Sequence, residues 1–406
     1  MGCSRGGAQR RLAFVALVGC LVGLASGSGQ AAPSAWTSTA TPLPPVQQNS
    51  HLLPGLGRDN GQSAGLAGRS YWVFADTLLR TDPAGLTFLD NTGAVTSDGD
   101  ASDGITLTSS NLFTEDAQAQ PDRFVPWSPQ ELAFTKKHAA GTCSSGDPYC
   151  GATFALWPGA IVADPARGRL LMSVNKLCRG GASKCTSQYV GTGIGTGLVS
   201  IDPAHRRVTR LRTLHNALPV SSPEGVDPTL LFDSDHSIST AFAHGGLLYA
   251  LFDCRSPAFL CAVGRVPLST PTDLDRWSFY QGTSRGRQIW DGNFYGATRV
   301  TPTGAAGGTI QWVPAMKAFL STYMVPLSND AVFRTAPTPV GPWSDEQIMF
   351  RTAAAGTSPN YALFAHPELA EQGGLVQYVS YYNSGTGLTQ LQRVRFCPAA
   401  NVICPG

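Results

Sequence analysis

The sequence predicts an all-β protein that folds as a five-bladed β-propeller. The chain has 406 residues, including 45 glycines and 29 prolines, and only 14% of its residues are charged. Such a composition is rich in turns and poor in amphipathic helices. After residue 50 a hairpin pattern returns five times, and further strand patterns follow most of the hairpins. Four-stranded sheets that recur at roughly 50 to 100 residues are typical of propeller blades. The alternative is a two-sheet β-sandwich with irregular loops.

The first 31 residues have the pattern of an export signal. Arg5, Arg10 and Arg11 precede the apolar run LAFVALVGCLVGLA, and small residues follow it. This run is shorter than the about 20 residues that span a bilayer, so we expect no membrane span. Cys20 could carry a lipid, but the apolar run continues past it. We therefore expect a secreted or periplasmic protein, with lipoprotein anchoring at Cys20 as the less favoured alternative.

Residues 32–50 are rich in Pro, Ser and Thr, and we expect them to form an N-terminal tail before a propeller domain of residues 51–406. Cleavage after residue 31 removes three arginines and no acids, which leaves 26 basic against 27 acidic side chains. This balance gives no indication of a nucleic-acid partner.

Each expected blade begins with a hairpin whose second strand is strongly apolar. The five hairpins pair GRDNGQSAGL with GRSYWVFADT, ALWPGAIVAD with RGRLLMSVNK, DHSISTAFA with HGGLLYALFD, NFYGATRVTP with MKAFLSTYMVP, and PNYALFAHPEL with GGLVQYVSYYN. Further strands are expected in TGLVSIDPAHRRVTRLRTL, CAVGRVPLSTPTDLDRWSFY and DAVFRTAPTPVGPWSDEQIMF.

Eight cysteines follow the signal, in four pairs with six residues between the partners of each. The pairs are Cys143 with Cys150, Cys178 with Cys185, Cys254 with Cys261, and Cys397 with Cys404. Zinc sites use shorter spacings with His or Cys partners, and no histidine lies inside these segments. In an exported chain the spacing predicts four local disulfides that staple loops or strand ends.

The first hairpin carries an aspartate on each arm. If Ala67 and Gly68 form its turn, Asp59 lies directly opposite Asp76. Two like charges in opposed positions are unfavourable in a sheet, so their presence points to a functional pair. The alternative is that each aspartate caps a loop or bonds to an arginine or to backbone amides.

The same reasoning predicts which side chains line the mouth of the channel beside this pair. They are Arg58, Asn60, Trp157, Asp235, His236, Asp291, Asn293, Tyr295, His366 and Glu368. Carboxylates and amides bond hydroxyl groups, and aromatic faces cover the apolar face of a sugar ring. Trp157 in the core and His366 as a structural histidine are the alternatives. GTGIGTG from Gly191 lacks the helix and the Lys-Ser/Thr of a phosphate-binding loop, and we expect a flexible connection there.

Four stretches, GRDNGQS, YWVFADT, TAPTPVGPWS and YALFAHPEL, together resemble the exported propellers called domain of unknown function 4185, part of which is glycoside hydrolase family 183, the endo-D-arabinanases. The resemblance spans most of the chain after residue 50. It implies a five-bladed propeller with a funnel-shaped active site that hydrolyses glycosidic bonds through acidic side chains. The matching carboxylates are Asp59 and Asp76.

These observations predict a secreted glycoside hydrolase acting on a polysaccharide or oligosaccharide, with an arabinan-type polymer suggested by the resemblance. Asp59 and Asp76 share the roles of general acid and of base or nucleophile, and Glu368 is the rival acid. We expect a monomer that requires no cofactor; a structural calcium ion in the channel stays open, and no metal ligands are assigned. The alternatives are a non-catalytic carbohydrate-binding propeller and a protein-interaction propeller.

Overall fold

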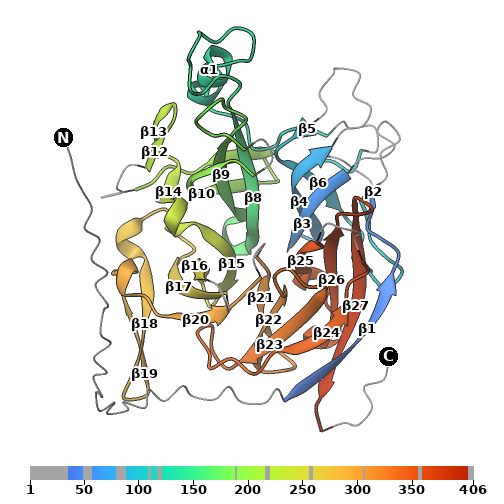
Figure 1. Ribbon diagram of the computed structural model, residues 1–406. Coiled ribbons are helices and arrows are strands. Elements are labelled where there is room, and N and C mark those ends of the chain that lie inside the picture. The colour runs from blue at the N-terminus through green and yellow to red at the C-terminus, as the bar shows by residue number, and fades with distance from the viewer. Residues whose placement is uncertain are drawn as a thin grey trace, which may run out of the picture. The chain divides into compact units, whose positions relative to one another are not determined.

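The computed structural model describes residues 35–48, 57–78, 88–107, 111–116, 121–187, 190–214, 220–255, 259–304, 307–354 and 359–400. All of them lie in one compact unit, residues 32–406. Five antiparallel sheets form the blades of a β-propeller, as predicted (Figure 1). The predicted export signal, residues 1–31, lies outside the described residues.

Each blade is built outward from one inner strand. Blade 1 contains β3 (Gly57–Leu66), β4 (Arg69–Leu78), β5 (Phe88–Leu89) and β6 (Thr92–Thr96). Blade 2 contains β8 (Thr153–Asp164), β9 (Arg169–Arg179), β10 (Thr192–Asp202), β11 (Arg207–Arg210) and β14 (Leu230–Asp233). Blade 3 contains β15 (Ile238–His244), β16 (Leu247–Arg255), β17 (Leu260–Pro267), β18 (Ser278–Ser284), β19 (Arg287–Asp291) and β20 (Arg299–Pro302). Blade 4 contains β21 (Thr309–Val313), β22 (Ala318–Met324), β23 (Asp330–Ala336) and β24 (Gln347–Arg351). Blade 5 contains β25 (Tyr361–Ala365), β26 (Val376–Asn383), β27 (Leu388–Pro398) and β1 (Trp36–Leu43).

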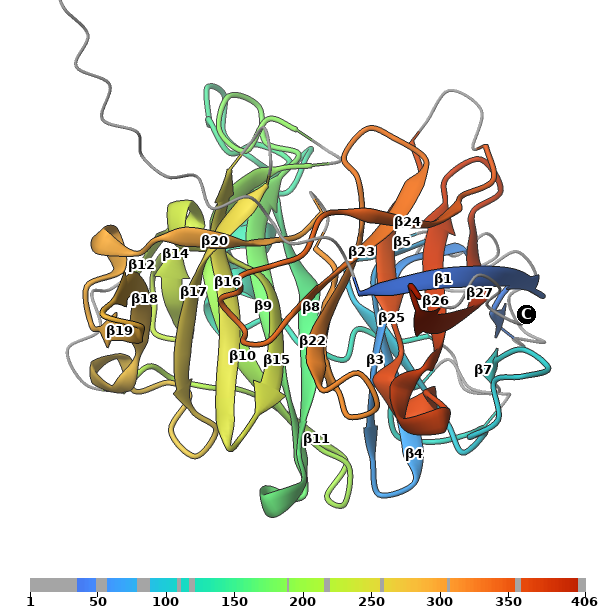
Figure 2. The same ribbon diagram turned by 90° about the horizontal axis from the view of Figure 1, so that it is seen from below.

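The inner strands β3, β8, β15, β21 and β25 contact one another in a closed ring around the channel. Each inner strand therefore begins at one mouth of the channel and ends at the other. The ring is closed by β1, the first strand of the chain, which pairs with the last strand, β27, from Trp36↔Pro398 to Leu43↔Leu391 (Figure 2).

Two expectations differ from the observed strands. Residues 32–50, expected to be a tail, contain β1 and β2 (Gln47–Gln48). The alternating Thr residues of β1 are typical of a strand, and β1 pairs with the outer edge of β27. In blade 4, β22 pairs with β21 instead of residues 293–302. The strand inside that stretch, β20, pairs with β17 of blade 3.

The core lies between neighbouring blades and explains the continuous apolar runs. In β4, Tyr71 and Val73 pack toward blade 2, whereas Trp72 and Phe74 pack toward blade 5. Successive side chains of a strand point to opposite faces, so a strand with a blade on each side is apolar at every position. The run from Tyr71 to Ala75 is therefore buried. Asp76 comes where this double burial ends.

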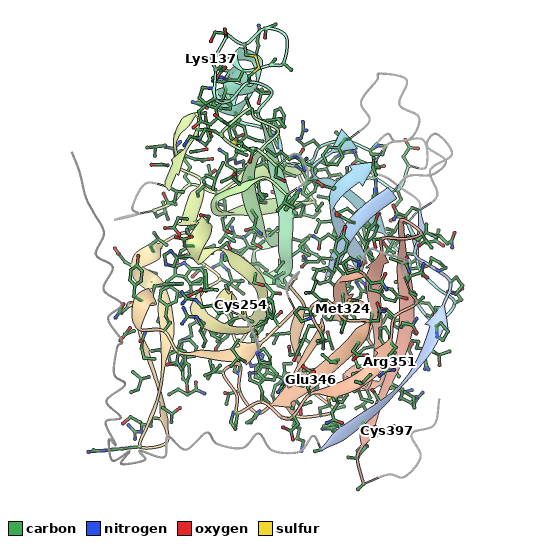
Figure 3. All side chains as sticks on the ribbon, viewed as in Figure 1. Lys137, Cys254, Met324, Glu346, Arg351 and Cys397 are labelled. Carbon is green, nitrogen blue, oxygen red and sulfur yellow. A yellow bond between two sulfur atoms is a disulfide. The ribbon has the colours of Figure 1, made fainter. Side chains whose placement is uncertain are left out.

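Shorter elements surround the blades. They are α1 (Pro129–Lys137), β7 (Thr106–Leu107), β12 (Val220–Ser222), β13 (Gly225–Asp227), η1 (Pro165–Arg167), η2 (Ser234–His236), η3 (Leu274–Arg276), η4 (Phe294–Gly296), η5 (Pro367–Leu369) and η6 (Gln372–Gly374). Ser128 and Glu131 form a capping box at the start of α1. Figure 3 shows Lys137 in the last turn of α1, at the periphery of the blades.

Three of the four predicted disulfides are present: Cys143–Cys150, Cys178–Cys185 and Cys254–Cys261. Cys397 lies in β27 (Figure 3), but its predicted partner Cys404 lies outside the described residues. Among the residues with a described structure, no helix is both long and apolar enough to cross a membrane.

Candidate active site

A double bulge in β3 places Asp59. The register of β3 on β4 runs regularly from Leu66↔Arg69 to Gln62↔Val73, and then shifts on both sides of Asn60. Asn60 and Gly61 have φ angles of 76° and 78°, in the left-handed region that Asn and Gly tolerate best. The Asn60 side chain donates to the carbonyl of Pro158 in β8 at 2.8 Å, which ties the bulge to blade 2. The predicted turn at Ala67 and Gly68 is correct, but the bulge means that Asp59 and Asp76 are not a ladder pair.

Asp59 is largely buried at the mouth and has one strong partner. The Tyr361 hydroxyl, at the start of β25, donates to Asp59 Oδ2 at 2.8 Å. The Oδ1 atom is shielded from solvent, and the backbone of Asp76 also donates a hydrogen bond to the carboxyl group. Burial, and next the charge of Asp76, raise the pKa of Asp59 to about 7. The two aspartates therefore lie close enough to interact, as predicted, but they are not directly opposed in the β3–β4 ladder.

Asp76 sits in different surroundings, at the end of β4. The indole N–H of Trp157 donates to its Oδ1 atom at 2.7 Å. The guanidinium of Arg179, at the end of β9, lies 3.4 Å from both carboxylate oxygens and stacks over the ring of Phe88. Burial raises the pKa of Asp76, and the Arg179 charge and the two donors oppose that rise. The side chain is 25% exposed, so water and solutes reach it.

Arg58 and Asn60, predicted to bind substrate, have structural contacts. Arg58 is 1% exposed and stacks over Phe74, on the face of β3 opposite to that of Asp59. Its burial lowers the pKa of the guanidinium to about 9. A group so enclosed cannot contact a substrate, which corrects the prediction for Arg58. Asn60 holds the bulge in place.

Glu368 and His366 lie at the other mouth, which contradicts the prediction that they join Asp59. Ser63 and Ser70 donate to Glu368 Oε1 at 2.5 and 2.6 Å. Ser63 comes four residues after Asp59 in β3, a distance along the strand of about 13 Å. The prediction failed because η5 follows the end of β25, whereas Asp59 stands near the start of β3. Glu368 is therefore no rival for the acid role beside Asp76.

His366 belongs to the same buried network and is a structural histidine. Its Nδ1 and Nε2 atoms lie 2.6 and 2.9 Å from the hydroxyls of Ser63 and Ser380, and its ring lies against Trp72. Because the Ser63 proton goes to Glu368, Nδ1 donates to Ser63 and Ser380 donates to Nε2. Complete burial lowers the pKa of His366 to about 3 and raises that of Glu368.

The remaining predicted residues gather in a separate place over blades 2 and 3. His236 and Tyr295 line a cavity of about 840 Å³ that contains neither Asp59 nor Asp76. Asp235 is exposed beside it. Asp291 accepts the backbone N–H of Asn293, whose side chain in turn caps η4. The predicted single mouth is thus three places, and only Trp157 joins the aspartates.

Tyr361 and Arg179 were missed by sequence reasoning. Tyr361 is the first residue of β25 and so stands level with the start of β3, a position that the hairpin pattern could have indicated. Arg179 follows Cys178 inside a predicted disulfide loop, and nothing in the hairpin pattern singles it out.

The central channel forms a cavity of about 690 Å³, lined by residues of all five inner strands. Away from it, Glu131, Glu224 and Asp227 form a carboxylate cluster that could hold a metal ion by its donor chemistry. The ammonium of Lys176 already lies among them, 2.6 Å from Glu131 and 2.8 Å from Asp227, and it also pairs with Glu224. An internal cation thus balances this cluster.

Neither a protein-family model nor a curated protein matches this chain. Solved structures match it in fold. A protein from Bacteroides ovatus ATCC 8483, provisionally described as a hydrolase, is 15% identical, with a TM-score of 0.51 over 83% of this chain and 85% of that one. Zg3597 of Zobellia galactanivorans, a family 117 glycoside hydrolase, is 11% identical, with a TM-score of 0.44 over 91% and 93%. The exo-β-1,3-galactanase of Phanerochaete chrysosporium is 12% identical, with a TM-score of 0.43 over 89% and 64%. Likeness at such identities shows the propeller fold alone.

Proposed function

We propose that this protein is a secreted glycoside hydrolase that cleaves a polysaccharide through Asp59 and Asp76. One observation carries the proposal: two carboxyl groups share a mouth in unlike surroundings, and only Asp76 is bound by a cation. Asp59 has a pKa of about 7, whereas Asp76 is bound by a guanidinium and an indole N–H. A protonated and an ionised carboxyl group side by side are what glycoside hydrolysis requires.

Asp59 would act as the general acid. Its raised pKa keeps a proton on the carboxyl group near neutral pH, and the Tyr361 hydroxyl orients that group through Oδ2. The oxygen of the scissile glycosidic bond would accept this proton as its bond to the anomeric carbon breaks. The leaving sugar then departs as a neutral alcohol, and Asp59 becomes a carboxylate.

Asp76 would supply the second carboxylate, either taking a proton from the attacking water or attacking the anomeric carbon itself. Arg179 favours its ionised form, and Trp157 fixes the orientation of its Oδ1 atom. In the first route, the proton that Asp76 takes from the attacking water returns through solvent to Asp59. In the covalent route, Asp59 takes the proton of the water that releases the sugar from Asp76.

Work outside the cytoplasm fits the three disulfides, because such bonds persist in oxidising compartments. An arabinan-type polymer is the substrate to test first, because the sequence resembles the endo-D-arabinanases. This assignment of substrate and of secretion is part of the proposal.

The test is reducing-end release from arabinan, arabinogalactan, xylan and galactan by the wild-type protein, Asp59→Asn and Asp76→Asn. We expect release by the wild type and a loss of at least about a hundredfold in each variant, with unchanged circular dichroism. Asp345→Asn is the matched control, since this exposed aspartate of blade 4 lies outside the pair. If the wild-type protein binds a glycan without cleaving it, the hydrolase proposal is wrong, and the protein is a carbohydrate-binding propeller.

A further inference from the structure

The cavity over blades 2 and 3 takes no part in the chemistry proposed above. Its volume of about 840 Å³ exceeds that of the central channel and lies in the range of small-molecule sites, roughly 300 to 1,000 Å³. Its walls come from the Cys178–Cys185 loop, the start of β10, β14 with η2, and η4. No residue that bonds to Asp59 or Asp76 is among them.

Strand β9 nevertheless connects this cavity with the acid pair. Arg179 bonds to Asp76, and its neighbour Cys178 lines the cavity. Consecutive residues of a strand point to opposite faces, so the cavity and the acid pair lie on opposite faces of the same end of β9. A polymer that passes around this end of β9 could therefore occupy both the cavity and the acid pair.

One wall carries an aromatic ring that is held in place and left open. Tyr295 is 85% exposed, and its ring meets those of His236 and Phe294 at angles of 88° and 85°. Two hydrogen-bonded contacts hold the turn that carries it: the Asn293 side chain caps η4, and Gln281 Nε2 donates to the Asn293 carbonyl at 2.7 Å. Tyr295 thus keeps an exposed ring at little further entropic cost on binding.

The polar groups of the cavity suit hydroxyl groups. Asp233 accepts from His236 Nδ1 at 2.6 Å, so in the neutral ring Nε2 is left as a hydrogen-bond acceptor. Other polar side chains in the lining are Lys184 and the hydroxyl-bearing Ser183, Thr186, Thr192, Ser221 and Ser234. An exposed aromatic ring beside hydroxyl groups and an imidazole matches a sugar, which has an apolar face and a polar edge.

Of the glycine run 191–197, Thr192, Gly193 and Ile194 line this cavity. The flexible connection expected for this run is instead part of a strand, because Thr192–Gly197 belong to β10. A Cβ atom on Gly195 would meet the carbonyl of Phe232 at 2.4 Å, and one on Gly197 the carbonyl of Thr229 at 2.2 Å. Only glycine lets β14 pack this closely on β10.

We propose that the cavity is a second carbohydrate-binding site, which holds a stretch of the polymer away from the bond being cleaved, with Tyr295 as its platform. Sugar binding in the cavity stands on the geometry above; its part in cleavage rests on the proposed function. The inferred substrate is accordingly a polymer, and a glycoside too short to reach from the acid pair to Tyr295 is a poorer one.

Affinity electrophoresis in gels containing arabinan, arabinogalactan, xylan or galactan tests the site, in an Asp76→Asn background so that the polymer is not consumed. We expect the background protein to bind at least one polymer, Tyr295→Ala to bind it about tenfold more weakly, and Tyr295→Phe to retain binding. Leu327→Ala, which removes a 94% exposed side chain of blade 4, is the matched control and should bind as the background does.

The proposal would be overturned if none of the four polymers retarded the background protein more than an unrelated protein. Equal binding by Tyr295→Ala and the background would overturn it as well. Hydrolysis by the otherwise wild-type protein is measured separately. Cleavage that persists while Tyr295→Ala binds normally removes the cavity site and leaves the hydrolase. Tyr295-dependent binding without any cleavage removes the hydrolase and leaves the cavity site.

Discussion

Replacing Asp59 with Asn should make the protein more stable at pH 8 while abolishing its activity. The pKa of Asp59 is about 7 in the folded protein, whereas an unfolded chain has a value near about 3.9. Because the folded state binds this proton more tightly, the contribution of Asp59 to stability is full below about pH 4 and is lost as the pH rises through about 7. A difference of about three pH units corresponds to about 4 kcal/mol.

Asparagine resembles the protonated carboxyl group and can still accept the Tyr361 hydrogen bond, so Asp59→Asn escapes that loss. Relaxation around the charged carboxylate reduces the figure, and we expect Asp59→Asn to be about 2 to 4 kcal/mol more stable at pH 8 and nearly equal to wild type at pH 4. Urea unfolding at pH 4, 6 and 8 measures the difference. Asp235→Asn, at an exposed position, should show no such trend.

The reasoning would be refuted by an Asp59→Asn protein that is no more stable than wild type at pH 8. In that case Asp59 is ionised in the folded protein at neutral pH, and the acid role cannot be assigned to it. A gain in stability that is equal at pH 4 and pH 8 would also count against the argument, because it would arise from packing and not from the proton.

Three further predictions concern single side chains. Tyr361→Phe removes a hydrogen bond that favours ionised Asp59, so the pKa of Asp59 rises and the basic limb of kcat/KM moves to higher pH; an unchanged or lowered limb would contradict this. His366, neutral in the fold with a pKa of about 3, lends stability that is present above about pH 6.5 and lost toward pH 3. His366→Gln should therefore flatten the fall in stability between pH 6 and 4 by about 1.4 kcal/mol per pH unit, as urea unfolding would show. Lys176→Met leaves the carboxylates of Glu131 and Asp227 short of a buried partner and should cost about 3 to 5 kcal/mol in urea unfolding, in contrast to an exposed Lys136→Met control.

The fold was predictable because a strand that is buried on both faces has apolar residues at every position. Strands such as β4 lie between two blades, and an apolar run bounded by turns is visible without any structure. Pairing between strands is less visible. Residues 293–302 were expected to pair with the strand that is β22, but the strand inside them pairs with β17, and residues 309–313 are the partner of β22.

The candidate site was predictable only in part. The mouth of the channel at which a residue lies depends on which end of an inner strand it occupies, and the sequence pattern does not show that end clearly. Asp59, Asp76 and Trp157 were placed together correctly, since the first two hairpins are adjacent blades. Glu368 and His366 follow the end of β25 and were assigned to the wrong mouth. The bulge at Asn60 was also invisible, because Asn-Gly in a strand reads as a turn until the two positive φ angles are seen.

The protonation of Asp59 depends on closure of the whole ring. Its bulge is tied to blade 2 by the bond from Asn60 to Pro158, and its Oδ2 atom is bound by Tyr361 of blade 5. Blade 5 is completed by β1, so the first strand of the chain secures the blade that holds Tyr361 in place. Burial, which is the largest cause of the raised pKa, exists only when these blades are in contact. Deletion of the chain up to Leu43 removes β1 and leaves β27 with an open edge. We expect this shortened protein to keep the hairpin of blade 1 but to lose the raised pKa of Asp59.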